Sequence, residues 1–222
     1  MGLIYDAKQI ASRDPAARSV AGVILLYPGF HALVYYRLSH FFFKLKWTGL
    51  ARWISEKGKF RTGVEIHPGA QIGKGLFIDH GAGIVIGETS VIGDDCTIYH
   101  GVTLGGRGHA KHTKRHPTIG DNVLIGTGAK LLGNITIGSN ANIGANAVIL
   151  HDVPEGATVV GVPGKIVKID GVKTVSHAVE LDHTDAEDPV ENELRGLCCT
   201  INELTEKVKA LESELAELKS KQ

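Results

Sequence analysis

The chain has 222 residues, of which 28 are glycine and 43% are apolar. Glycine is nearly twice its usual share of about 7%, but the apolar fraction suits a folded core, so simple disorder is excluded. The 24 basic and 24 acidic residues give a formal net charge of zero, which excludes attraction of the whole protein to nucleic acid or to an anionic membrane. This length predicts one or two domains.

The three cysteines, Cys96, Cys198 and Cys199, are too few for a disulfide framework and lack zinc-ligand spacing. We therefore expect a protein of the reducing cytoplasm. The apolar stretch from Val20 to Tyr36 begins too late for a signal peptide, and a Pro-Gly pair interrupts it. Because a spanning helix needs about 20 continuous apolar residues, we expect two packed helices here and no membrane association.

Residues 1–61 show no short repeat and are predicted to form a small helical domain. Asp14 precedes Pro15, and an acidic cap followed by proline at the first helical position is typical of a helix start. A further helix is predicted from Trp47 to Phe60. We expect this helical domain to rest on the end of the domain that follows.

Residues 62–170 repeat with a period of six, and 21 of the 28 glycines lie between Gly63 and Gly164. The aliphatic positions form three runs: Ile66, Ile72, Ile78 and Ile84; Ile86, Ile92, Ile98 and Leu104; and Ile119, Ile125, Leu131, Ile137, Ile143 and Ile149. Period six is neither helical nor alternating. It is typical of a solenoid in which one aliphatic side chain per side points inward and glycine permits each corner. The pattern resembles the hexapeptide-repeat proteins, which implies a mainly β fold, a left-handed parallel β-helix that associates as a trimer.

The period is interrupted between Leu104 and Ile119 by the sequence GGRGHAKHTKRHPT, which has four basic residues, three histidines and no acid. Solenoids place insertions on one face, often the binding face. A solvated surface loop is the alternative interpretation.

Residues 171–189, rich in charge and histidine, are predicted to be a linker, and residues 190–222 a coiled coil. Apolar residues occupy heptad positions a (Leu194, Ile201, Val208, Leu215) and d (Val190, Leu197, Leu204, Leu211, Leu218). Four heptads are typical of a coiled coil. On a trimeric body we expect three parallel strands.

Six segments resemble the serine O-acetyltransferase family: RDPAA (13–17), YPGFHALVYYRLSHF (27–41), VEIHPGAQIGKGLFIDHGAGIVIGET (64–89), VTLGG (102–106), RHPTIGDNVLIGTGAKLLGN (115–134) and GVPGKIV (161–167). The resemblance spans the helical region and the repeats. It implies transfer of acetyl from acetyl-CoA to the hydroxyl of L-serine, giving O-acetylserine for cysteine biosynthesis. It implies no cofactor and no metal, with acetyl-CoA as co-substrate.

The resemblance also implies roles for single residues. His80 is the expected general base, since an imidazole titrates near neutral pH, and Glu65 is expected to orient it. These two residues are 15 positions apart, close to one coil of about 18 residues. The residues implied for binding serine are Asp14, Asp79, Arg115 and His116.

Coenzyme A is expected in a groove between two subunits. The residues proposed to contact it are Gly106, Thr127, Ala145 and Lys165. L-cysteine, nearly isosteric with serine, is expected to compete with it. We expect a homotrimer, with a hexamer open. Because the chain ends Ser220-Lys221-Gln222 and not in the isoleucine common in the family, we expect no stable complex with O-acetylserine sulfhydrylase through this end.

Three alternatives stay open at this point. One is a hexapeptide acetyltransferase for another small hydroxyl acceptor. Another is a γ-class carbonic anhydrase, in which three of the 11 histidines would hold zinc. The last is a trimeric scaffold without enzymatic activity that presents the coiled coil to a partner.

Overall fold

The structure is a computed structural model that describes residues 2–108 and 113–173, together with Ile201, Thr205 and Lys207. The chain divides into two compact units, Met1–Ala178 and Val179–Gln222. Apart from those three residues, the predicted coiled coil with Cys198 and Cys199 lies outside the described residues. The centre of the insertion, 109–112, also lies outside them.

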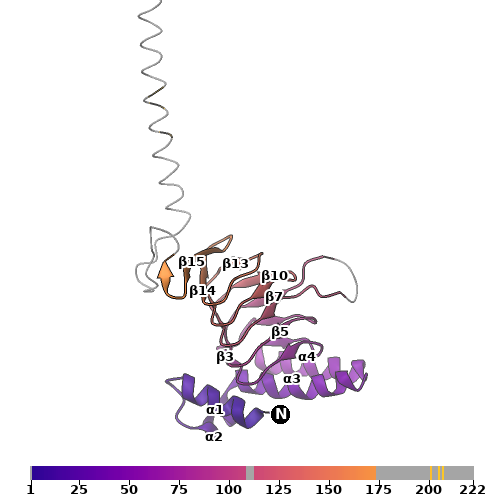
Figure 1. Cartoon of the computed structure of the whole chain (residues 1–222). Coiled ribbons are helices and arrows are strands. Elements are labelled where there is room, and N and C mark those ends of the chain that lie inside the picture. Colours follow the sequence, from indigo (N-terminus) through magenta and orange to yellow (C-terminus); the bar gives the residue numbers. More distant parts are fainter. Residues whose placement is uncertain (1, 109–112, 174–200, 202–204, 206, 208–222) are drawn as a thin grey trace, which may run out of the picture. The chain divides into compact units, whose positions relative to one another are not determined.

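Four helices precede the first strand (Figure 1): α1 (Leu3–Arg13), α2 (Val20–Leu26), α3 (Pro28–Lys44) and α4 (Thr48–Thr62). Helix α4 agrees with the helix predicted from Trp47. The predicted helix start at Asp14 is wrong, because Asp14 follows the last residue of α1 and α2 begins only after Ser19. The Ser19 hydroxyl accepts a 3.0 Å hydrogen bond from the Gly22 N–H and so caps α2. None of the described helices is both long and apolar enough to cross a membrane.

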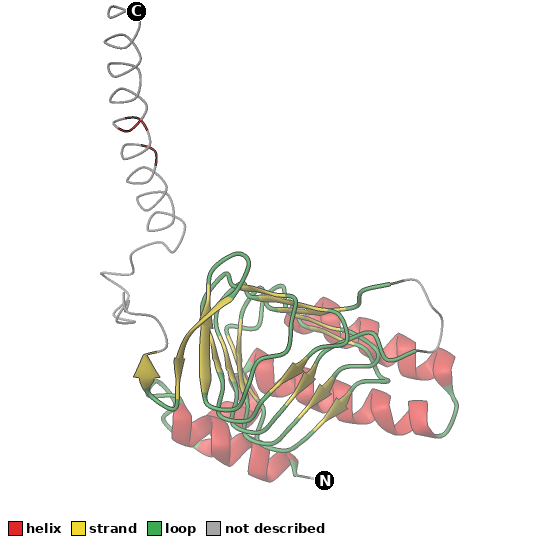
Figure 2. Cartoon of the chain, turned by 45° about the horizontal axis from the view of Figure 1, so that its top comes forward, coloured by secondary structure: helices red, strands yellow, loops and turns green. Residues whose placement is uncertain are grey.

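After the helices the chain winds into a parallel β-solenoid with three sheets (Figure 2), which confirms the predicted repeat fold. Sheet A contains β1 (Glu65–Ile66), β4 (Val85–Ile86), β7 (Thr103–Gly105), β10 (Lys130–Leu132) and β13 (Val148–Ile149). Sheet B contains β2 (Gln71–Ile72), β5 (Val91–Ile92), β8 (Thr118–Ile119) and β11 (Thr136–Ile137). Sheet C contains β3 (Phe77–Asp79), β6 (Thr97–Tyr99), β9 (Leu124–Ile125), β12 (Asn142–Ile143), β14 (Ala157–Val160), β15 (Lys165–Ile169) and β16 (Val172–Lys173).

The predicted aliphatic positions stack as ladders inside the solenoid. Ile66 pairs with Ile86, Ile86 with Leu104, and Leu104 with Leu131, and each of these side chains is at most 4% exposed. These pairs define successive coils of 20, 18 and 27 residues. The 27-residue coil carries the predicted insertion. The 20-residue coil was not foreseen, since Ile86 rather than Ile84 stacks on Ile66.

The parallel stack ends before the predicted limit of residue 170. Strand β14 is the last parallel strand of sheet C, and β15 pairs with it in the antiparallel direction, followed by β16. A hairpin therefore closes this sheet in place of another coil.

The helices pack against the first coil, as expected. Helix α3 approaches β3 so closely at Gly29 that an added Cβ would lie 2.2 Å from the Ile78 carbonyl oxygen. On α1, the buried Asp6 carboxylate accepts a 2.6 Å hydrogen bond from the Gly75 N–H and lies 3.6 Å from the Arg37 guanidinium of α3. These contacts hold α1 and α3 to the turn between β2 and β3.

Candidate functional site

Turns join the three sheets along the edges of the solenoid, and two edges carry most of the predicted site residues. The CA edge comprises the turns from sheet C to sheet A: 80–84, 100–102, 126–129 and 144–147. Backbone hydrogen bonds of 2.7–2.9 Å tie neighbouring turns together. The AB edge comprises the turns from sheet A to sheet B: 67–70, 87–90, the insertion at 106–117, and 133–135. The CA edge carries His80, Thr127 and Ala145, and Asp79 ends the strand that leads into it. The AB edge carries Gly106, Arg115 and His116.

His80 lies in the longest turn of the CA edge. This turn has five residues between strands, whereas the next has three, from His100 to Val102, and the two extra residues produce the 20-residue coil. His80 has a left-handed backbone, with φ of 49°, which non-glycine residues adopt rarely and often at functional sites. Its side chain is 81% exposed, and its Nε2 lies 3.7 Å from the Asp79 carboxylate. The imidazole therefore projects from the solenoid, available to a ligand.

A second histidine lies directly beyond it on the CA edge. Asp79 pairs with Tyr99 across β3 and β6, so His100 takes the place of His80 one coil further on. The two imidazole centroids are 6.5 Å apart. Sequence reasoning did not single out His100, although its separation from His80 equals the 20-residue coil.

Two hydrogen bonds from within the N-terminal helical region hold the Asp14 carboxylate. Its Oδ1 accepts a 2.7 Å hydrogen bond from the Ala16 N–H, and its Oδ2 accepts one of 2.7 Å from the Tyr27 hydroxyl. The hydrogen bond to Asp14 raises the pKa of Tyr27, and the charge of Asp79 raises it further. The Tyr27 hydroxyl thus bonds to Asp14 and lies within electrostatic range of Asp79. Tyr27 was not among the predicted site residues.

Glu65 does not contact His80 in the described part of the chain. Its carboxylate lies 2.5 Å from the Lys59 Nζ and 3.9 Å from the Arg52 guanidinium, both on α4. The hydrogen bond to Glu65 also raises the pKa of Lys59. The orienting role of Glu65 thus stays a prediction, and reaching His80 would require a change of partner.

Thr89 fixes the end of the insertion on the AB edge. Its hydroxyl oxygen accepts hydrogen bonds from the backbone N–H groups of Arg115 and His116, at 3.1 and 3.2 Å. The same hydroxyl donates to the His116 Nδ1 at 2.8 Å, and the Thr89 N–H donates to that nitrogen at 3.2 Å. Because Nδ1 is an acceptor, the neutral ring carries its proton on Nε2.

His116 is 6% exposed and packs against glycine backbone. A Cβ added to Gly87 would lie 2.0 Å from this ring, and one added to Gly106 would lie 3.0 Å from its Nε2. Burial lowers the pKa of His116, and the positive charges of Arg115 and Lys114 lower it further. At neutral pH, His116 is therefore an uncharged N–H donor beside the cationic Arg115.

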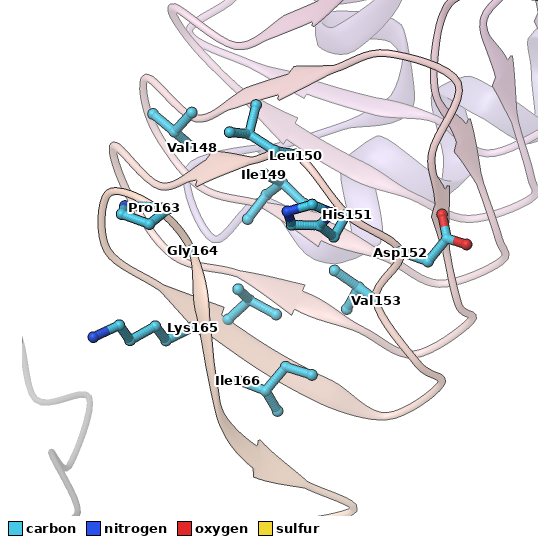
Figure 3. A pocket seen from close by; sticks show the side chains of 11 residues that line it. Val148, Ile149, Leu150, His151, Asp152, Val153, Pro163, Gly164, Lys165 and Ile166 are labelled. Atoms are coloured by element: carbon cyan, nitrogen blue, oxygen red, sulfur yellow. The ribbon is translucent and has the colours of Figure 1, made fainter.

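The other residues proposed for coenzyme A continue along the CA edge and beyond it. Thr127 and Ala145 occupy successive turns, and the Thr127 carbonyl accepts a 2.7 Å hydrogen bond from the Asn146 N–H. Lys165 lines a cavity of about 320 Å³ at the far end of the solenoid. Figure 3 shows its ammonium directed away from the aliphatic side chains of this cavity.

One subunit does not bring the two edges together. The edges lie at opposite ends of the strands of sheet A, and the chain from Ala82 to Glu88, which runs from one edge to the other, spans on the order of 20 Å at about 3.3 Å per residue. The CA edge offers an imidazole and carboxylates that suit proton transfer and a cation. The AB edge offers a guanidinium and an N–H donor that suit a carboxylate. Within the described residues, no three His, Cys, Asp or Glu side chains are grouped as metal ligands would be.

The bacterial transferase hexapeptide family (six repeats) matches residues 116–151. The serine acetyltransferase of Bacillus licheniformis is 50% identical over 209 residues, covering 94% of this chain and 95% of the relative. The serine acetyltransferase of Helicobacter pylori strain J99 is 55% identical over 170 residues, 77% of this chain and 99% of the relative.

The solved structures to which this chain is similar are also serine acetyltransferases. Serine acetyltransferase from Neisseria gonorrhoeae, in a crystal structure with serine, has a TM-score of 0.72 and 45% identity over 75% of this chain and 67% of its own. The enzyme from Brucella abortus in complex with coenzyme A has a TM-score of 0.72 and 42% identity over 74% of this chain and 66% of its own, so the match leaves about a third of that chain unspanned. With half of its residues identical to a relative that it spans almost completely, the chain belongs to the serine acetyltransferase family.

Proposed function

We propose that this chain transfers acetyl from acetyl-CoA to the hydroxyl of L-serine, with His80 as the general base. The observation that carries the proposal is the projecting imidazole of His80 beside the Asp79 carboxylate. The crystal structures of relatives with serine and with coenzyme A support both substrates.

The reaction needs a base because a neutral hydroxyl is a weak nucleophile. His80 removes the proton of the serine hydroxyl as its oxygen attacks the thioester carbonyl carbon. The carbon–sulfur bond then breaks, and the proton passes from the imidazolium to the leaving thiolate. The products are O-acetylserine and coenzyme A, and the first is the activated precursor from which we expect cysteine to be made.

Serine is a zwitterion, so its two charged groups need opposite partners. Asp14 and Asp79 are suited to the ammonium group. Arg115 can bind the carboxylate in bidentate fashion, with the neutral His116 as a further donor. A relative's structure in complex with cysteine supports competition by L-cysteine for the same groups.

Because the two sets of partners lie on different edges, the complete site requires two subunits. We place the CA edge of one subunit against the AB edge of the next. Repeating this contact around a three-sided solenoid closes a ring of three, the expected homotrimer, and creates a groove for coenzyme A past Thr127 and Ala145. Two such trimers would form the hexamer left open above. Lys165 is proposed to meet a phosphate of coenzyme A.

The test is acetyl transfer by the purified full chain. Release of the coenzyme A thiol is followed with serine as acceptor, and the ester product is identified by mass spectrometry. His80→Ala should lower kcat by about 10²–10⁴-fold, the usual contribution of a general base. The matched control is His31→Ala, because the His31 ring bonds only to the Ile24 carbonyl among the described residues. Retention of full activity in His80→Ala would refute the assignment.

A further inference from the structure

We infer that Tyr27 is a positioning residue for the ammonium group of the substrate, acting through Asp14. The inference rests on the function proposed above. Sequence reasoning gave Tyr27 no role, and its hydroxyl is the only side-chain group among the described residues that hydrogen-bonds to the Asp14 carboxylate.

The Asp14 carboxylate is held at both oxygens and, among the residues that the structure describes, has no cationic partner. The Ala16 N–H binds Oδ1 and the Tyr27 hydroxyl binds Oδ2, each at 2.7 Å. Within the described residues, no lysine or arginine forms an ion pair with Asp14 or with Asp79, whose charged neighbour is His80. Each oxygen can still accept a further hydrogen bond. Asp14 and Asp79 thus each offer a negative charge that an ammonium would neutralise.

Both ends of the Asp14–Tyr27 contact are attached to the solenoid. On one side, the Arg13 guanidinium donates to the Asp95 carbonyl at 2.8 Å and also to the Gly75 carbonyl. On the other side, Tyr27 is two residues before Gly29, whose backbone lies against the Ile78 carbonyl. Ile78 directly precedes Asp79, so the same close approach positions Tyr27 relative to Asp79.

The Tyr27 hydroxyl therefore fixes the orientation of the Asp14 carboxylate. Without it, the carboxylate keeps its charge and its Ala16 contact but is free to rotate about its side-chain bonds. Loss of this hydrogen bond should weaken ammonium binding without affecting proton abstraction by His80.

The test compares Tyr27→Phe with Tyr5→Phe in the full-length enzyme. Tyr5 offers a matched control, since its hydroxyl also bonds to an aspartate, Asp95, at 3.1 Å, and removing that hydroxyl leaves the bond from Arg13 to the Asp95 carbonyl in place. We expect Tyr27→Phe to raise the KM for serine about tenfold, in line with loss of a hydrogen bond to a charged group. The kcat and the KM for acetyl-CoA should stay within about twofold of the wild-type values. Inhibition by 3-hydroxypropionate, which lacks the ammonium group, should not change.

A double-mutant cycle with Asp14→Asn separates positioning from a general loss of stability. If Tyr27 acts through Asp14, the double variant should have the same KM for serine as Asp14→Asn alone. Multiplied effects in the double variant would overturn the inference, as would a KM in Tyr27→Phe equal to that of Tyr5→Phe. A wild-type enzyme that does not acetylate serine would overturn the proposed function, and this inference with it.

Discussion

Subunit complementation tests whether one site uses two edges from different subunits. His80→Ala removes the base from the CA edge, and Arg115→Ala removes the guanidinium from the AB edge. Each variant alone forms only defective sites. In a mixed trimer, however, an Arg115→Ala subunit contributes an intact His80 to a neighbour with an intact Arg115.

The expected activity of the mixed trimers follows from the geometry of the ring. A cyclic trimer has three equivalent contacts between subunits. In a trimer with two subunits of one variant and one of the other, a single contact joins an intact CA edge to an intact AB edge. Both mixed compositions should therefore have about one third of the wild-type activity per trimer.

The assay uses co-expression of the two variants with different affinity tags. Two successive affinity steps isolate mixed trimers, and native mass spectrometry verifies their composition. Activity at saturating serine and acetyl-CoA is then compared with wild type and with each variant alone. Mixed trimers no more active than their parents would refute the pairing of edges, because a site within one subunit cannot be restored by mixing.

Three further predictions concern stability and the AB edge. Asp6→Ala leaves the largely buried Arg37 guanidinium without its counter-charge. The free energy of unfolding, measured in urea, should therefore fall by about 3 kcal/mol. A fall of less than about 1 kcal/mol would contradict the importance of this ion pair. Gly87→Ala places a Cβ 2.0 Å from the His116 ring and should raise the KM for serine at least about tenfold, whereas Gly49→Ala, with no atom near the added Cβ, should leave the KM unchanged. Because burial lowers the pKa of His116, its contribution to stability is present above pH 6.5, its ordinary pKa, and is lost as the pH falls through the lowered value. The thermal midpoint should therefore fall between pH 7.5 and 5.5, and less so in His116→Gln; an equal fall in both proteins would contradict the assignment.

The solenoid was predictable from sequence because each inward position needs a similar side chain, and stacking makes that need recur at a fixed interval. Three ladder pairs with the regular spacing of 18 residues show this directly: Ile86 with Leu104, Ile119 with Ile137, and Ile125 with Ile143. The turn at Asp14, where a helix start was wrongly predicted, could not be predicted in the same way. An aspartate before a proline suits a cap equally well in a turn after a helix, and the Tyr27 hydroxyl that binds it comes from a distant part of the sequence.

The residues of the proposed site stay a prediction from sequence, and their arrangement could not be predicted at all. Motif resemblance proposed His80, Arg115 and His116, but it did not show that His80 lies on a different edge from Arg115 and His116. The pairing of Glu65 with Lys59 could not be predicted either, because Lys59 lies on α4, and the orientation of this helix against sheet A depends on packing. Thr89 was passed over for a similar reason, since its hydroxyl bonds to residues 26 and 27 positions later, about one turn of the lengthened coil.

The two irregular coils have a consequence for how such a protein can change. Compared with the regular coil of 18 residues, one coil has two extra residues after Ile78 and another has nine in the insertion after Leu104. In both cases the next aliphatic residue still pairs with its neighbour in the ladder: Ile86 with Leu104, and Leu131 with Leu104. A length change at a corner is thus absorbed locally, and the remaining coils fold on an unchanged template. Both irregular turns carry residues of the proposed site. The residues of the site can therefore be replaced by grafting turns of a different length, while the regular coils keep the scaffold stable.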